Sequence, residues 1–126
     1  MRNIDDLPHH QKIGKEGEAF ALEWVKRNGY KVLHTNWRFG KKELDIVTLK
    51  DNMIIVFEVK TRLNDYWEEP KEAVRHRKQK NIIEAADAYV NHYDYDMEVQ
   101  FDILSLLHKG NGFELEHIPD AFYPTL

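Results

Sequence analysis

Glu43–Lys60 reads ELDIVTLKDNMIIVFEVK, and it contains two apolar segments separated by Lys50-Asp51-Asn52. The segments cover residues 43–49 and 53–61, and both are rich in the β-branched and aromatic residues that favour strands. Asp and Asn are frequent in tight turns, so we expect the two strands to form a hairpin. A two-residue Asp51-Asn52 turn places Lys50 opposite Met53.

Four charged side chains interrupt this hairpin at its open end. Alternation along a strand places Glu43 and Asp45 on one face of the first strand. Glu58 and Lys60 share one face of the second. The register sets Asp45 opposite Glu58 and Glu43 opposite Lys60. Paired carboxylates repel unless a cation or a shared proton lies between them, so a divalent metal ion is the simplest interpretation.

An ordinary set of salt bridges on the wet face of an amphipathic hairpin is the alternative. The apolar residues at the other end of the hairpin oppose it. Ile54 and Val56 share a face with Glu58, and Val47 shares a face with Asp45. Both faces are therefore expected to be covered, with the charged group at an edge of the sheet.

Oxygen ligands without thiolates favour Mg²⁺ or Mn²⁺, whose sites use one or two carboxylates completed by water and substrate phosphate. The chemistry indicated is phosphodiester hydrolysis, in which Lys60 orients the attacking water or stabilises charge on phosphorus. The sequence contains no cysteine, which excludes disulfides and cysteine zinc sites and is compatible with the reducing cytosol. We expect a cytoplasmic protein without an organic cofactor.

The chain has 126 residues, a length typical of one domain. Its 42% apolar and 32% charged residues are typical of a folded protein in water. The formal net charge of −4 argues against a general polyanion coat, so any nucleic acid must meet a local positive patch. The first residues lack the apolar stretch of a secretory signal, and no segment approaches ~18 uncharged apolar residues, so we expect neither a signal peptide nor a membrane span.

Periodicity and turn residues predict one α/β domain over residues 1–126, with its core at about 13–118. The order is αβββαββ, and the central sheet is mixed and flanked by helices. The expected elements are a helix at 13–28, strands at 30–35, 43–49 and 53–61, a helix at 70–90, and strands at 98–107 and 113–118. Residues 36–40 are expected to turn, and the tail after Pro119 has no expected structure.

Basic side chains gather in the first half of the second predicted helix: Lys71, Arg75, Arg77, Lys78 and Lys80. Such a cluster binds phosphates without reading sequence, and the alternative is a solvated helix face. Gln79 lies among them and is predicted to contact substrate or to be an ordinary surface residue. Tyr66 and Trp67, in the preceding loop, are expected to stack on a base or to pack under the loop.

The motif Glu43-Leu44-Asp45 followed by Val56–Arg62 resembles the bipartite metal-binding motif of the PD-(D/E)XK, or restriction-endonuclease-like, superfamily. Further segments make the chain similar to the small bacterial YraN-like endonuclease family, which is related to archaeal Holliday-junction resolvases. These segments are Gly14–Glu18, Ala21, Gly29-Tyr30, Asn36-Trp37-Arg38, Lys78 and Phe101-Asp102. The resemblance spans Gly14 to Leu107.

This resemblance implies a site with defined roles. Asp45 and Glu58 would bind the metal ion together with the backbone carbonyl of Val59. Lys60 would be the catalytic lysine. Glu18 would reach the same site from the first helix, and its alternative is a solvated helix residue.

Two arginines flank the hairpin. Arg38 and Arg62 are predicted to bind phosphate, although Arg38 has an ion pair with Glu43 as its alternative.

Two positions depart from the family pattern. Lys42 replaces a glycine that is usual in the family, which leaves the loop geometry open. Gln100 replaces a common arginine, which leaves one phosphate contact open.

We therefore expect a metal-dependent endonuclease acting on DNA, with branched or structured DNA as one option. The alternative is a non-catalytic nucleic-acid-binding or interaction module on the same fold, and a third option is a structural partner of another protein. A homodimer is also open, because related resolvases act as dimers. The aromatic residues considered for its interface are Trp67, Phe122 and Tyr123.

Overall fold

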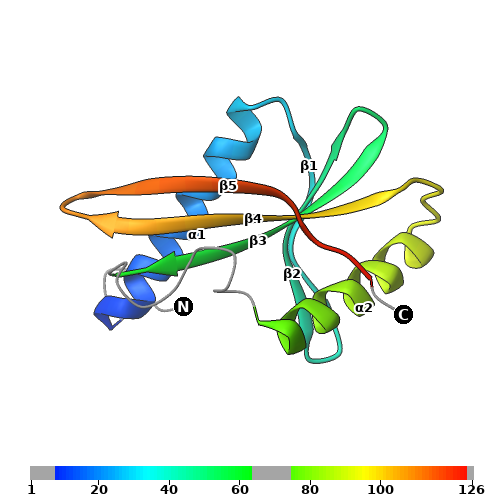
Figure 1. Ribbon diagram of the computed structural model, residues 1–126, viewed down its shortest axis with the longest axis horizontal. Helices are drawn as coiled ribbons and strands as arrows, with labels where there is room; N and C mark the ends of the chain where they lie inside the picture. Colours follow the sequence, from blue (N-terminus) through cyan, green and yellow to red (C-terminus); the bar gives the residue numbers. More distant parts are fainter. Residues whose placement is uncertain (1–7, 64–74, 125–126) are drawn as a thin grey trace.

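The structure, a computed structural model, describes residues 8–63 and 75–124 of the chain (Figure 1). The described elements are α1 (His9–Arg27), β1 (Lys31–Phe39), β2 (Lys42–Lys50), β3 (Met53–Arg62), α2 (His76–His92), β4 (Val99–Lys109) and β5 (Gly112–Phe122). Their order confirms the predicted αβββαββ arrangement. The five strands form one sheet in the order β1-β2-β3-β4-β5.

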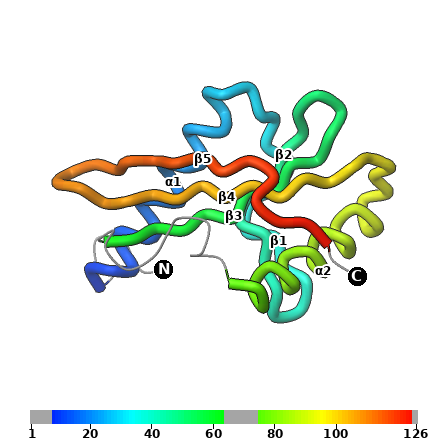
Figure 2. Tube along the Cα trace, viewed as in Figure 1, coloured from blue at the N-terminus to red at the C-terminus, as the bar shows by residue number. Residues whose placement is uncertain are grey.

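The sheet is mixed, as predicted. β3 and β4 run parallel, because α2 lies between them in the chain and returns it to the same end of the sheet. The other neighbouring pairs are antiparallel. The path of the chain between the strands can be followed in Figure 2.

The two helices cover opposite faces of the sheet, so the core has two layers of side chains. On β3, Ile54 and Val56 pack in the cluster that contains residues of α2. Ile55 and Phe57 pack in the cluster that contains residues of α1. β3 is therefore buried on both faces, which explains its nearly continuous apolar sequence.

The predicted turn between β2 and β3 is confirmed. Asp51 and Asn52 both adopt left-handed backbone angles, with φ of 52° and 61°. Two consecutive left-handed residues are characteristic of the type I′ turns that close two-residue hairpins, and Asn and Asp tolerate this conformation. Lys50 pairs with Met53, which sets the register of the hairpin.

The first and last strands are longer than predicted. β1 continues through the expected turn region to Phe39, which pairs with Lys42. β5 continues past Pro119 to Phe122, whose ring stacks on Phe101 at 5.2 Å between centroids. Phe122 is 5% exposed, so it is a core residue and not the surface aromatic expected for a dimer interface.

Both helices begin at positions that differ from the prediction. α1 begins at His9, directly after Pro8, because the fixed φ of proline suits a helix start. Arg75 is still extended, with φ −73° and ψ 160°, and α2 begins only at His76. Residues 70–74 lie outside the described part. No helix within residues 8–63 and 75–124 is long and apolar enough to cross a membrane.

Gly17 fixes how closely α1 approaches β3. A Cβ atom built on Gly17 would lie 2.3 Å from the hydroxyl oxygen of Thr61, closer than two such atoms can approach. Gly14, one turn earlier in the same helix, has nothing within 4 Å of the equivalent position. The missing side chain at Gly17 therefore lets the first half of α1 lie directly on the end of β3.

We predict opposite effects of alanine at these two glycines. Gly14→Ala should stabilise the protein by about 0.5–1 kcal/mol, because alanine favours helix. Gly17→Ala should destabilise it by about 1–3 kcal/mol, because the clash with Thr61 outweighs that gain. Urea unfolding measures both, and Thr61→Ala should restore part of the loss. Equal stabilisation by both substitutions would contradict the close approach.

Candidate functional site

The paired ladder of β2 and β3 stops before the charged residues. Its last pair is Ile46 with Phe57. Beyond this point the side chain of Asp45, not its backbone, bonds to β3. The backbone N–H of Val59 donates to Asp45 Oδ2 at 2.8 Å. The predicted Glu43–Lys60 pair does not form, because the ladder ends first.

Where the ladder ends, the side chains of β1 and β2 switch from one face of the sheet to the other. Leu44 packs on the α2 side and Ile46 on the α1 side, although residues two apart in a regular strand share a face. On β1, Trp37 packs on the α2 side, whereas Thr35 lines a pocket beside α1. Asn36 between them has φ 51°, a conformation that asparagine tolerates. This bend lies beside Asp45, which lines the pocket on the α1 side, whereas its neighbour Glu58 contacts Lys78 of α2.

Glu58 lies beside Asp45 and is deeply buried. Its side chain is only 7% exposed, and a hydrogen bond joins the two carboxyl groups. The predicted proximity of Asp45 and Glu58 is thus confirmed, although they are not ladder partners. Lys78, in the first turn of α2, places its Nζ 3.4 Å from Glu58 Oε1 while 58% of its side chain stays exposed.

Burial and repulsion favour protonation of this pair. Burial is the main cause that raises the pKa of Asp45, and the Val59 N–H partly opposes it. Burial, followed by the charge of Asp45, raises the pKa of Glu58 to about 8 although Lys78 acts in the opposite direction. The pKa of Lys78 is raised chiefly by Glu58. Lys78 thus offsets only part of the cost that burial imposes on the two negative charges.

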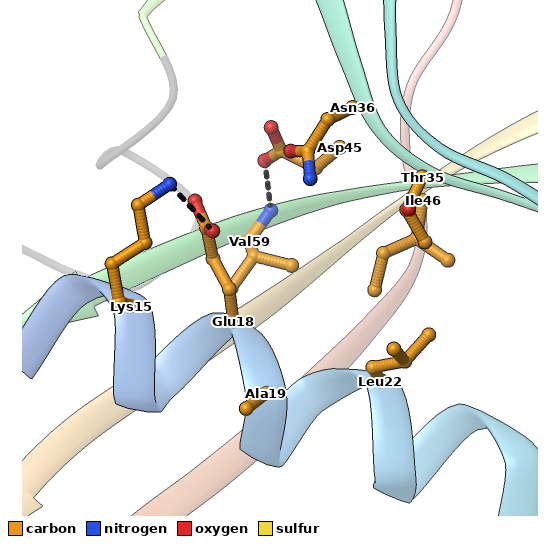
Figure 3. A pocket seen from close by; sticks show the side chains of 9 residues that line it. All are labelled: Lys15, Glu18, Ala19, Leu22, Thr35, Asn36, Asp45, Ile46 and Val59. Carbon is orange, nitrogen blue, oxygen red and sulfur yellow. Dashed lines mark hydrogen bonds and ion pairs between the residues drawn. The ribbon is translucent and has the colours of Figure 1, made fainter. Parts of the chain in front are cut away.

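A pocket of about 190 Å³ opens beside Asp45 on the α1 side (Figure 3). Glu18 lines it, and Lys15 pairs with Glu18 at 3.6 Å. The charge of Glu18 raises the pKa of Asp45. Glu18 therefore lies beside the predicted site, and 40% of its side chain is exposed.

The donor set fits a hard divalent cation. Asp45 and Glu58 supply adjacent oxygens, and burial raises the pKa of both carboxyl groups. Within the described residues no group of three or more Asp, Glu or His side chains is placed to hold an ion. Mg²⁺ accepts such a site, since it keeps several waters. The roles of Glu18 and of the Val59 carbonyl as ligands stay predictions.

The predicted phosphate-binding residues have different surroundings. Arg38 Nε lies 3.1 Å from Glu43 Oε2, which is the alternative given for it, while 70% of its side chain stays exposed. Arg75 is exposed at the start of α2, and Gln79 is partly buried. Arg62 ends β3 and is partly buried.

Three residues considered in the sequence lie outside the described residues: Lys71, Tyr66 and Trp67. The two departures from the family pattern are both engaged in contacts. Lys42 pairs with Glu84 of α2. Gln100 donates to Asp102 Oδ1 at 2.9 Å.

Asp102 belongs to a separate, structural cluster. Its Oδ2 lies 2.7 Å from His117 Nε2, and its Oδ1 accepts the backbone N–H of Asp120 at 3.0 Å. These bonds lie where the β4–β5 register shifts. The side chain is 1% exposed and fully bonded, so Asp102 supports the fold and stands outside the site.

Sequence reasoning missed the α1 side of the site. Lys15, Leu22 and Asn36 line the pocket beside Asp45 and had no assigned role. The spacing of Lys15, Glu18 and Leu22 places them on one helix face, a signal that could have joined them. Asparagine adopts left-handed backbone angles more often than most residues, but the sequence does not predict that Asn36 does so inside a strand.

The comparisons with known proteins concern nearly the whole chain. The model of the family described as "Uncharacterised protein family UPF0102" matches residues 17–106. A UPF0102 protein of Parabacteroides distasonis is 47% identical over 93% of this chain and 97% of its own. Proteins with the same description from Bacteroides thetaiotaomicron and Flavobacterium psychrophilum are 42% and 37% identical, over 95% and 93% of this chain and 99% and 98% of their own.

We predict that Glu58 makes the metal-free protein less stable as the pH rises. Unfolded, its carboxyl group has the ordinary pKa of 4.5, and folding raises this to about 8. The folded chain therefore holds a proton that the unfolded chain releases, and stability falls between these values by up to ~1.4 kcal/mol per pH unit. Urea unfolding with a chelator present measures this slope.

Glu58→Gln should flatten the slope, because glutamine has the same size and no proton to lose. Glu23→Gln, at an exposed position of α1, is the control and should leave the slope unchanged. If the unfolding free energy of the wild type fell with pH no more steeply than that of Glu58→Gln, the pKa of Glu58 would not be raised by folding.

Proposed function

The chain belongs to the uncharacterised protein family UPF0102, and from its site we propose that it is a metal-dependent endonuclease of the PD-(D/E)XK type that hydrolyses phosphodiester bonds in DNA. One observation carries the proposal. The buried carboxyl group of Glu58 lies beside the half-buried one of Asp45 where the β2–β3 ladder ends, with a pocket on one side and a lysine on the other. Such a pair is costly to maintain for structure alone.

The pair is suited to hold Mg²⁺ or Mn²⁺. Bound there, the ion would act as a Lewis acid on a phosphate oxygen and lower the pKa of a coordinated water. Asp45 is held rigidly for this task by the Val59 N–H, and Glu58 by its burial in the sheet. Preorganised carboxylates need little rearrangement when the ion enters.

Lys60 supplies the positive charge for the reaction. It follows Glu58 by two residues on β3, so both side chains leave the same face of the strand. In this proposal its ammonium group orients the attacking water or stabilises charge on phosphorus. The oxygen of the water bonds to phosphorus, the P–O bond to the leaving oxygen breaks, and a proton passes to that oxygen.

The start of α2 offers a surface for the DNA backbone. Arg75, Arg77 and Lys80 are exposed there, next to Lys78 at the site. Clustered cations neutralise phosphates without reading bases, which suits recognition of structure over sequence. Branched DNA is therefore included among the proposed substrates.

The second candidate is a nucleic-acid-binding module without catalysis. The contact between Lys78 and Glu58 favours it, because this lysine already supplies part of the charge that a metal ion would supply. Both candidates share the basic surface of α2. They differ in whether Asp45 and Glu58 bind a metal ion that the reaction requires.

Cleavage should depend on Asp45 and Lys60. We predict that Asp45→Asn and Lys60→Met each lower cleavage about 100-fold or more, on labelled single-stranded, duplex, flapped or four-way-junction DNA with Mg²⁺ or Mn²⁺. Asparagine still accepts the Val59 N–H, so folding is preserved and circular dichroism verifies it. Asp87→Asn, exposed on α2, should cleave normally.

Absence of metal-dependent cleavage by the wild type on every substrate, with DNA binding retained, would select the non-catalytic module. Equal cleavage by the wild type and a folded Asp45→Asn would place the reaction at another site.

Metal binding should respond to Lys78 and Asp45 in opposite directions. Asp45→Asn removes a ligand and should weaken Mn²⁺ binding about 10-fold or more. Lys78→Met removes the cation that now contacts Glu58 and should tighten it several-fold. Free Mn²⁺ is measured by paramagnetic resonance without nucleic acid.

Arg77→Met removes an exposed cation from the same helical turn and is the matched control. It should change the affinity less than Lys78→Met does. If Lys78→Met weakened Mn²⁺ binding, its ammonium group would not be competing with the ion for Glu58.

A further inference from the structure

The pocket beside Asp45 has two chemically different walls. Asn36, Glu18 and Lys15 form its polar wall around the carboxylate. Leu22 and Ile46 form an apolar wall, and Figure 3 shows them on the side of the pocket away from Lys15. The polar wall suits charged groups, whereas the apolar wall offers nothing to an ion or a phosphate.

The size of the pocket restricts what can use the apolar wall. At about 190 Å³ it holds several waters or one small ring system. For comparison, an engineered apolar cavity of about 150 Å³ binds benzene. A flat ring that packs against Leu22 and Ile46 would leave its edge toward the polar wall.

We propose that this pocket receives the base of one unpaired nucleotide next to the phosphate that is cleaved. The assignment rests on the proposed nuclease function and adds the substrate class to it. The ring packs on Leu22 and Ile46, while the Asn36 amide and the Glu18 carboxylate face the hydrogen-bonding edge of the base. Its phosphate then lies at Asp45, at the mouth of the pocket.

This placement selects against intact duplex. A base inside a duplex is stacked and paired, and unstacking it costs a few kcal/mol unless it is already free. Single strands, flaps, bulges and the open centres of junctions present unpaired bases without that cost. In this proposal the pocket makes the enzyme select its substrate by structure.

Binding without divalent metal tests the assignment independently of cleavage. The probes are three labelled DNA duplexes of one sequence: fully paired, with one bulged nucleotide, and with the same bulge lacking its base. Fluorescence anisotropy should show roughly fivefold or tighter binding of the bulge that carries a base than of the other two. Equal affinity for all three would overturn the assignment.

Filling the pocket should remove this preference. Ala19 lines the pocket and is exposed, so Ala19→Phe places a ring there with little disturbance of the core. It should lower the affinity for the base-carrying bulge to that for the abasic bulge, and leave duplex binding unchanged. Asn91→Phe, exposed on α2, is the control and should retain the preference.

A second variant keeps the test decisive if Ala19→Phe does not fold. Asn36→Gly retains the left-handed backbone and removes the amide, so it should weaken binding of the base-carrying bulge alone. Bulge preference without any metal-dependent cleavage would reject the nuclease and keep the pocket. Metal-dependent cleavage with no bulge preference would keep the nuclease and reject the pocket.

Discussion

The close contact of two carboxyl groups, one buried and one half-buried, is the interaction on which the rest of this structure depends. Asp45 and Glu58 repel when both are charged, and burial disfavours each charge. The fold compensates with one N–H, from Val59, and one ammonium group, from Lys78. Neither removes the cost, because the pKa of Glu58 still stands at about 8. The metal ion proposed for this site would supply the positive charge that offsets the remaining cost.

The architecture explains how such a pair persists. β3 is covered on both faces, so Glu58 is rigidly held by a strand that cannot shift. The ladder with β2 ends one residue earlier, which frees Asp45 to turn its carboxylate toward β3. Each helix then brings one charged residue to the gap, Glu18 from α1 and Lys78 from α2. The site is therefore reached from both layers of the protein.

The sequence predicted the parts of this arrangement that follow from local rules. Alternation and the Asp51-Asn52 turn yielded the register of the hairpin, and with it the proximity of Asp45 and Glu58. Contacts between distant segments escaped prediction. The break of the ladder at Asp45 coincides with a bend at Asn36, and asparagine ordinarily indicates a turn. Strand pairing held that residue inside β1 because its neighbours gain ladder bonds with β2.

The parallel pairing of β3 with β4 gives the site an order of assembly. A two-residue hairpin such as β2–β3 forms within about 1–10 μs, because its partners are adjacent in the chain. β4 joins only after α2 has crossed the sheet, a slower step that closes a long loop. From this order we expect the acidic pair to meet while still hydrated and to lose its water late. A dissolved divalent cation would thus have time to enter before the walls close, and its concentration would influence how fast the last step of folding proceeds.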